Sequence, residues 1–172
     1  MAQRMGKEEV VAFLRDGGYE FKMVEHEAVF TMEGMEALNL PFGEEVVKNL
    51  FLRDDKKRNY YLVVMPEDKP ANLKELRTKL EARPLRFASE DDLVQYLGLR
   101  GGAVSPFGVL NDEEALVQVV FDEELRTYKG LGVHPNDNTA TLHVALDDMV
   151  HIVEEHGNAF RFVELSRPEP EE

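Results

Sequence analysis

The chain has 172 residues, of which 43% are hydrophobic, and a formal net charge of −14. It contains no cysteine, which excludes disulfides, thiolate metal sites and a cysteine nucleophile. No apolar run approaches the ~20 residues that a membrane helix needs, and the first seven residues lack the apolar segment of a signal peptide. We therefore expect a single cytoplasmic domain with one core.

The first part of the chain predicts two helices and three strands. Residues 7–15 carry apolar side chains at helical spacing, and Gly17 and Gly18 follow as a stop. A charged turn separates two apolar runs, which is typical of a β-hairpin. We expect helices at 7–15 and 31–38, and strands at 19–24, 46–52 and 60–65.

The second part predicts three further helices and four strands. Asn72 is a favourable N-cap, and Ser89 with Asp92 has the spacing of a capping box. Asp147 is expected to cap the last helix and Gly157 to stop it. We expect helices at 73–80, 91–97 and 147–156, and strands at 104–110, 115–121, 139–146 and 159–165.

The order of these elements favours an α+β fold. Strands outnumber βαβ alternations and several neighbours are joined by turns of hairpin length, so we expect a mixed, largely antiparallel sheet flanked by helices. No repeat or linker divides the chain, and we place one domain at 1–165. The proline- and glutamate-rich residues 166–172 predict a disordered acidic tail.

The most informative stretch is His134-Pro135-Asn136-Asp137-Asn138-Thr139, which lies between two apolar runs. Pro135 favours an extended conformation at His134, so local geometry sets the direction of the imidazole. The following residues are turn formers whose side chains bond to their own backbone. Taken alone, the stretch is equally well read as a turn with an exposed histidine.

Two other segments add to this signal. Lys48 and Asn49 interrupt an otherwise apolar strand, and the run Gly102–Gly108 is a loop bounded by glycines. Ser105 lies in that loop, but a nucleophile elbow requires Gly-x-Ser-x-Gly and the flanking positions are Ala103 and Phe107. Serine hydrolysis is therefore not supported.

Metal and cofactor chemistry also lack support in the sequence. His151 and His156 are spaced i, i+5, which does not place two ligands on one face of a helix. The chain has neither a dinucleotide-binding glycine motif after a strand nor a Walker lysine. We expect no metal and no cofactor.

In order and spacing, these segments resemble the free-standing prolyl-tRNA editing family, the YbaK-like aminoacyl-tRNA deacylases. The resemblance extends from about Val10 to Val163. Gly102 to Pro106 fits the family's Gly-x-x-x-Pro loop, and His134 to Thr139 fits its His-Pro-x-x-Asn-Thr motif. The branch that looks most similar removes alanine mischarged onto the proline tRNA, so the resemblance implies the YbaK/prolyl-tRNA synthetase-associated domain fold and ester hydrolysis assisted by the 2′-hydroxyl of the substrate.

The resemblance also implies roles for individual residues. Lys48, Gly102 and His134 are expected to be catalytic, while His26, in the early histidine segment, stays outside the core site. The residues expected to bind or shape the substrate pocket are Asn49, Ala103, Ser105, Pro106, Asn138 and Thr139. Of these, Asn138 and Thr139 are expected to hold the histidine loop more than to touch the substrate.

The charge distribution indicates where RNA would bind. Residues 48–86 carry 11 Lys or Arg against 6 Asp or Glu, whereas the rest carries 9 against 28. Arg53, Lys56, Lys57 and Arg58 concentrate positive charge at the hairpin turn, and phosphate contacts need such cations. The alternative is an ordinary solvated turn.

We expect the acceptor end of an aminoacylated tRNA as the partner, prolyl-tRNA synthetase as a further candidate, and neither DNA nor a membrane.

Two alternatives to this function remain open. A sibling deacylase of the same fold could act on another amino acid, such as cysteine or serine, because sequence alone does not show the pocket volume. A non-catalytic module that binds RNA or protein could keep the fold without turnover. The intact Lys48, Gly102 and His134 argue against the second alternative.

Overall fold

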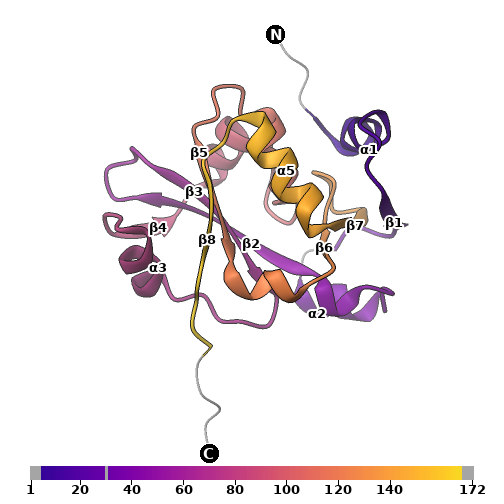
Figure 1. Cartoon of the computed structure of the whole chain (residues 1–172), viewed down its shortest axis with the longest axis horizontal. Coiled ribbons are helices and arrows are strands. Elements are labelled where there is room, and N and C mark those ends of the chain that lie inside the picture. The colour runs from indigo at the N-terminus through magenta and orange to yellow at the C-terminus, as the bar shows by residue number, and fades with distance from the viewer. Residues whose placement is uncertain (1–4, 30, 168–172) are drawn as a thin grey trace, which may run out of the picture.

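The computed structural model describes residues 5–29 and 31–167, and its strands form two sheets (Figure 1). The smaller sheet is antiparallel, in the order β1 (Phe21–Glu25), β7 (Ala140–Ala145), β6 (Gly130–Val133). The larger sheet has the order β4 (Leu85–Phe87), β2 (Val47–Asp54), β3 (Tyr60–Pro66), β5 (Val117–Asp122), β8 (Phe160–Val163). The helices are α1 (Lys7–Asp16), α2 (Met32–Ala37), α3 (Leu73–Leu80), α4 (Glu90–Asp92) and α5 (Leu146–His156).

The predicted α+β class with a mixed, largely antiparallel arrangement is confirmed. β3 pairs in parallel with β5, and β5 with β8, while the other strand pairs are antiparallel. The strands form two sheets rather than one, and an isolated parallel bridge between Val46 and Gly132 connects them. A Cβ at Gly132 would come within 2.9 Å of the Val46 backbone, so glycine permits this close approach.

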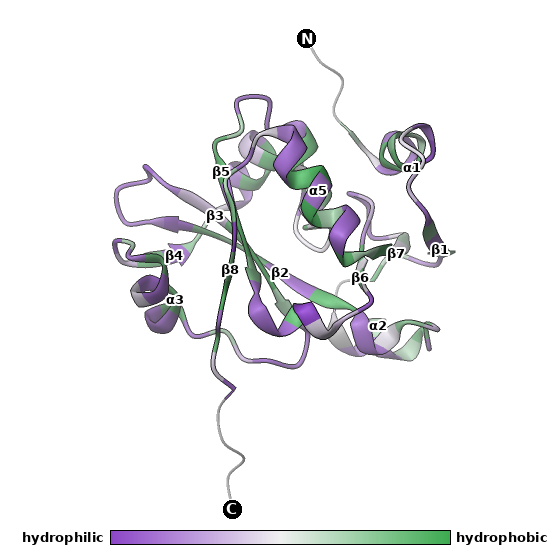
Figure 2. Ribbon diagram, viewed as in Figure 1, coloured by the Kyte–Doolittle hydropathy of each residue, from purple (hydrophilic) through white to green (hydrophobic). Residues whose placement is uncertain are grey.

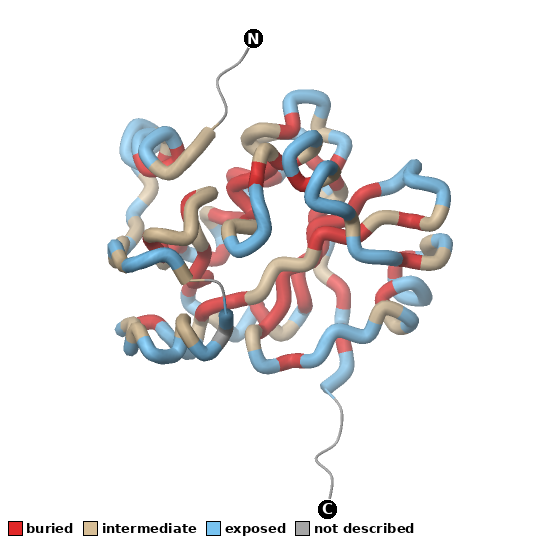
Figure 3. Tube along the Cα trace, turned by 180° about the vertical axis from the view of Figure 1, so that it is seen from behind, coloured by how far each residue is buried: buried red, intermediate tan, exposed pale blue. Residues whose placement is uncertain are grey.

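The larger sheet is buried on both faces. On β3, Leu62 and Val64 point into the larger core, which also contains α5, while Val63 and Met65 point into a smaller core under α3. This alternation follows from the two-residue period of a strand. Figure 2 shows green, apolar strands in the middle of the molecule, and Figure 3 shows the same strands as the red, buried centre.

Most predicted elements are found within a few residues of their expected bounds, but one is wrong. Residues 104–110, expected as a strand, overlap the 3₁₀ helix Pro106–Asn111. The Ser105 hydroxyl accepts a hydrogen bond from the Phe107 N–H, and proline is favoured in the first turn, so these two residues start a helix. The strands β4 and β6 were not predicted; β6 contains two glycines, which are rare in strands.

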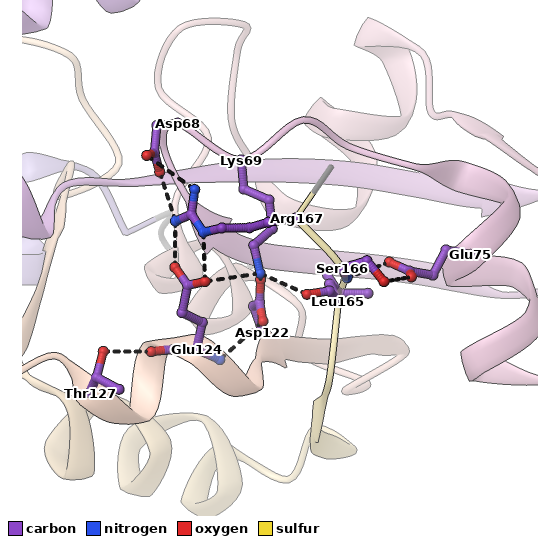
Figure 4. Close-up of polar contacts among 9 residues, drawn as sticks. All are labelled: Asp68, Lys69, Glu75, Asp122, Glu124, Thr127, Leu165, Ser166 and Arg167. Carbon is purple, nitrogen blue, oxygen red and sulfur yellow. Dashed lines mark hydrogen bonds and ion pairs between the residues drawn. The ribbon is translucent and has the colours of Figure 1, made fainter. Parts of the chain in front are cut away.

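The C-terminal residues that the structure describes are held by ionic contacts (Figure 4). Arg167 pairs with Asp68 at 3.0 Å and with Glu124, and the Ser166 N–H donates to Glu75 at 2.8 Å. Ser166 and Arg167, the first two residues of the expected tail, thus have defined contacts, and the disorder of the tail stays a prediction. The rest of the expected tail, 168–172, lies outside the described residues.

A buried lysine lies at the centre of this network. Lys69 is 1% exposed, and its Nζ contacts Asp122 at 2.7 Å and the Leu165 carbonyl at 2.8 Å. Removal of one partner from such a buried pair costs about 3–5 kcal/mol, because the other charge is left without compensation. The network thus fixes the segment that follows β3, including Glu67 and Asp68, against β5 and the end of β8.

None of the helices in the described part of the chain combines the length and the apolar character needed to span a bilayer.

Candidate active site

A cavity of about 260 Å³ lies where the two sheets meet. Its polar lining includes Lys48, Asn49, Gly102 and His134, four of the residues that the sequence motifs single out. Apolar side chains complete the wall: Val29, Met35, Val46, Val47, Val104 and Val133. Three segments that are far apart in the sequence thus converge on one pocket.

The bridge between the sheets explains how Lys48 and His134 come together. Val46 and Gly132 are paired in parallel. Lys48 lies two residues after Val46, and His134 lies two residues after Gly132. Because side chains two residues apart point to the same side of an extended chain, Lys48 and His134 emerge next to each other. Both line the cavity.

Lys48 is half-buried near the start of β2, where it is paired with Met65 of β3. Burial lowers the pKa of Lys48, while the nearby carboxylates of Asp68 and Glu67 oppose that shift. Among the described residues, no carboxylate lies within ion-pair distance of its Nζ. The ammonium group is therefore available to an electronegative group of a ligand.

His134 has a defined tautomer. Its Nδ1 lies 2.8 Å from the Ala140 carbonyl, which can only accept, so Nδ1 carries the proton. Burial lowers the pKa of His134 below its ordinary value of 6.5, and the imidazole is therefore neutral at pH 7. Nε2 makes no hydrogen bond within the described chain and keeps a lone pair as a proton acceptor.

His26 is not among the lining residues of the cavity, and its ring centroid lies 6.2 Å from that of His134. Its Nδ1 donates to the Glu27 carbonyl at 2.8 Å, so Nε2 accepts from the Thr141 hydroxyl at 2.8 Å. The Thr141 oxygen is 3.5 Å from His134 Nδ1. His26 thus orients Thr141, which in turn supports the ring orientation of His134.

The glycine loop brings only part of its predicted residues to the cavity. Gly102 has a φ of 88°, a conformation that favours glycine, and it lines the cavity. The Ala103 N–H donates to the Arg100 carbonyl at 3.1 Å, so the turn already uses this group. Ser105 and Pro106 are buried and start the 3₁₀ helix, and we assign them a structural role.

Polar side chains hold the histidine loop in place. Asn138 Nδ2 donates to the Val29 carbonyl at 3.0 Å, and the Thr139 N–H donates to Asp137 at 2.8 Å. Asn136, to which the sequence assigned no role beyond turn formation, donates to the Met5 carbonyl at 2.8 Å and to the Phe107 carbonyl at 3.3 Å. This loop is therefore attached to the 3₁₀ helix and to the start of the chain.

The basic hairpin lies far from the cavity. Asp54 accepts hydrogen bonds from the N–H groups of Lys56 and Arg58, and this arrangement shapes the turn. The side chains of Lys56, Lys57 and Arg58 are exposed, while Arg53 is partly buried. Lys48 lies near the other end of β2, and at ~3.3 Å per strand residue the turn is roughly 25 Å away. The structure does not bring the hairpin to the pocket.

The histidines outside this site have local partners. His151 pairs with Glu155 at 2.6 Å on α5, and His156 contacts Asn158 at 2.6 Å beyond the end of that helix. His143 pairs with Glu45 at 2.7 Å. The described residues contain no group of three or more His, Cys, Asp or Glu side chains that could hold a metal ion.

Sequence reasoning missed Glu67 as a site residue. This glutamate follows β3 directly and lines the cavity beside Asn49. Its Oε1 and the Asn49 Oδ1 are both buried and have no hydrogen-bond partner among the described residues. Glu67 is one of 34 acidic residues and belongs to no sequence motif. The one feature that could have indicated it is its position directly after β3, the strand that pairs with the strand of Lys48.

Fold and site together define a class of protein: a small α+β domain that presents a lysine, an asparagine, a glycine loop and a neutral histidine to one pocket. The model of the aminoacyl-tRNA editing domain matches residues 26–152. The chain belongs to this family, and the family resemblance of the sequence motifs is confirmed.

Individual relatives agree with this assignment. The chain is 47% identical over 159 residues to the prolyl-tRNA editing protein ProX of Acetoanaerobium sticklandii, covering 92% of this chain and 97% of that protein. It is 38% identical to the zebrafish (Danio rerio) prolyl-tRNA synthetase associated domain-containing protein 1, covering 87% and 82%. A crystal structure of a proposed trans-editing enzyme for prolyl-tRNA synthetase shares the fold, with a TM-score of 0.71, 19% identity and coverage of 96% and 100%.

Proposed function

We propose that this protein is a trans-editing hydrolase that deacylates mischarged proline tRNA, with alanine as the expected amino acid. The observation that carries this proposal is the convergence of Lys48, Gly102 and His134 on one cavity. The cavity volume of about 260 Å³ is below the ~300–1,000 Å³ of pockets for drug-sized ligands. Such a volume suits an aminoacyl group better than a whole nucleotide.

Relatives support the choice of the tRNA. The relative with 47% identity is named a prolyl-tRNA editing protein, and that name is the basis for proline tRNA as the substrate of this chain. We assign the activity to a domain at residues 1–165 and place it in the cytoplasm, where translation occurs. Prolyl-tRNA synthetase is a candidate partner, because one relative is named a prolyl-tRNA synthetase associated domain-containing protein.

The residues suggest a mechanism that needs no protein nucleophile. Water adds to the ester carbonyl carbon, the bond to the ribose oxygen breaks, and the products are the free amino acid and the tRNA with its hydroxyl restored. Lys48 and the N–H of Gly102 would stabilise negative charge on the oxygens, and Asn49 would orient the same end. The Nε2 of His134 would accept a hydrogen bond from the ribose 2′-hydroxyl or the attacking water, and the 2′-hydroxyl would assist the reaction.

A panel of mischarged tRNAs tests this function. Purified full-length protein is expected to release alanine from proline tRNA and to leave prolyl-tRNA intact, because the function requires that the cognate amino acid be spared. The same measurement with cysteine or serine attached to this tRNA shows whether the protein instead removes one of these amino acids. If the protein releases none of these amino acids and still binds the tRNA, the alternative of a non-catalytic binding module holds and this proposal is wrong.

We further propose that Arg53, Lys56, Lys57 and Arg58 contact the backbone of the acceptor stem. Charge reversal at the exposed Lys56, Lys57 and Arg58 should raise KM for full-length tRNA about tenfold or more at physiological salt, because each lost phosphate contact weakens binding. The kcat should change little, since the turn is roughly 25 Å from Lys48. Steady-state kinetics at two salt concentrations would measure both effects.

The control for this prediction is reversal of equal charge on a surface away from the hairpin. Arg15, Lys22 and Arg126 are exposed, lie outside the basic segment 48–86 and offer such a set. Equal effects of the two sets would show that the hairpin is only a solvated turn, and the RNA would then dock elsewhere.

A further inference from the structure

Glu67 has a buried carboxylate oxygen in the candidate site that no described group satisfies. Glu67 and Asn49 both line the cavity, and the Glu67 Oε1 and the Asn49 Oδ1 are buried without a hydrogen-bond partner among the described residues. A buried polar atom without a partner costs about 1–3 kcal/mol, and native structures contain few of them. Two such acceptors in one pocket indicate a ligand that brings hydrogen-bond donors.

The charges around Glu67 indicate that this donor is positive. Burial raises the pKa of Glu67, and the negative charges of Glu36 and Asp68 add to that shift, while Lys48 opposes it. A cation placed beside the carboxylate would reverse these unfavourable effects. The ammonium of Lys48 lies in the same lining but beyond ion-pair distance of Glu67 in this structure.

An aminoacyl ester carries one group that fits both acceptors. Its carbonyl and ester oxygens can only accept hydrogen bonds, and the 2′-hydroxyl offers one donor. The α-ammonium group offers three N–H donors and a positive charge, as does the ammonium of a lysine side chain. It matches two unpaired acceptors of which one is a carboxylate.

We propose that Glu67, together with the Asn49 side-chain oxygen, binds the α-ammonium group of the aminoacyl ester and thereby selects esters with a free amino group. This inference rests on the proposed function and adds a residue that determines specificity. The ammonium would lie on the Glu67 side of the pocket, and the ester oxygens would face Lys48 and Gly102. The positive ammonium of the substrate would thus face the negative Glu67, and the electronegative ester oxygens would face the positive Lys48.

The network around Lys69 holds Glu67 in this position. Asp68, the next residue, pairs with Arg167 at 3.0 Å, and Lys69 is buried against Asp122. The backbone on the C-terminal side of Glu67 is therefore fixed, while Pro66 ends β3 on the other side. A preorganised carboxylate binds a cation better than a mobile one, since little side-chain entropy remains to be lost.

The test compares two esters of the same tRNA with Glu67→Gln. One ester carries alanine and the other carries lactate, which has a hydroxyl in place of the ammonium group. Glu67→Gln should lower kcat/KM for the alanyl ester about 10- to 100-fold, as expected for a hydrogen bond to a charged group. It should change kcat/KM for the lactyl ester less than about threefold, because that ester lacks the positive charge. Glu67→Asp, which keeps the charge, should restore part of the preference for alanine.

Glu113→Gln is the matched control. It makes the same change at an exposed glutamate outside the cavity lining, and it should leave the ratio of the two substrates unchanged. Thermal unfolding of each variant accompanies the kinetics.

Equal loss on both esters would overturn the proposal, and so would equal ratios in Glu67→Gln and Glu113→Gln. The first outcome would mean that Glu67 supports the pocket or contacts the adenosine, which both substrates share. If the unmodified protein hydrolyses neither ester, the proposed function is wrong and this inference is wrong with it. Hydrolysis of alanyl-tRNA at the same rate by the unmodified protein and by Glu67→Gln contradicts the inference alone.

Discussion

Lys48→Ala and His134→Ala are each expected to lower kcat/KM for mischarged proline tRNA about 10²- to 10³-fold, the range for loss of one electrostatic or acid–base group. Both residues line the cavity and neither belongs to the apolar cores. Deacylation should therefore be lost while the fold persists. Steady-state kinetics would measure kcat/KM, and single-turnover rates at saturating protein would report the chemical step.

The exposed Lys79 and His151 provide matched controls of the same residue types. Alanine at either position should leave the rate within about twofold, because surface substitutions outside special sites have small effects. Loss of His134 also removes the hydrogen bond to the Ala140 carbonyl, so thermal unfolding of this variant is measured as well. Near-normal rates in folded Lys48→Ala and His134→Ala proteins would show that the pocket is not the active site.

The acidity of His134 adds a pH dependence to this experiment. Burial places its pKa below 6.5, and only the neutral imidazole accepts a proton. The rate should therefore stay high above pH 6.5 and fall as the pH is lowered through the pKa of His134. The limb of the pH profile that belongs to His134 should be absent in His134→Ala.

The second large effect is expected from the substrate. Replacement of the terminal 2′-hydroxyl by hydrogen, with alanine on the 3′-oxygen, should reduce turnover about 10²-fold or more and leave binding nearly unchanged. A hydroxyl next to the ester is held at a high effective concentration, so its contribution to the rate is large.

A double-mutant cycle that combines the deoxy substrate with the His134→Ala variant would show which group of the protein acts with the 2′-hydroxyl. If His134 Nε2 accepts its hydrogen bond, the deoxy substrate should lose much less activity in His134→Ala than in the unmodified protein, because coupled groups have non-additive effects. Competition with uncharged tRNA would measure binding. Hydrolysis of the deoxy ester at the normal rate would exclude assistance by the substrate and make His134 the first candidate for a general base acting on water.

Local chemistry explains why most elements could be predicted. Asn72 caps α3 and Ser89 forms a capping box with Asp92, as their side chains and spacing indicate. Glycine ends α5 at Gly157 with a φ of 107°. Caps and stops depend on a few neighbouring residues, so they can be recognised without the rest of the chain.

The same local view was insufficient for residues 104–110. The apolar residues there favour a strand, yet Phe107 and Val109 are buried on a 3₁₀ helix that packs against α5 and residues 93–97. When a segment is buried on all sides, its apolar residues no longer distinguish the period of a strand from that of a helix. The N-cap Ser105 and the proline at 106 then favour a helix. Strand β6 was missed for a related reason, because Gly130 and Gly132 are explained only by the close approach of Val144 and Val46, respectively.

By itself, the sequence determined the fold class and three segments of the candidate site, because Lys48, Gly102 and His134 stand in motifs whose order and spacing are visible in the chain. Only the tertiary structure decided which of the neighbouring residues line the pocket. The N–H of Ala103 is used in a turn, and Ser105 caps a helix. Glu67 reaches the pocket because β3 pairs with β2 and the Lys69 network holds the next segment. Such roles depend on hydrogen bonds and burial between distant segments, and no local pattern of residues records them.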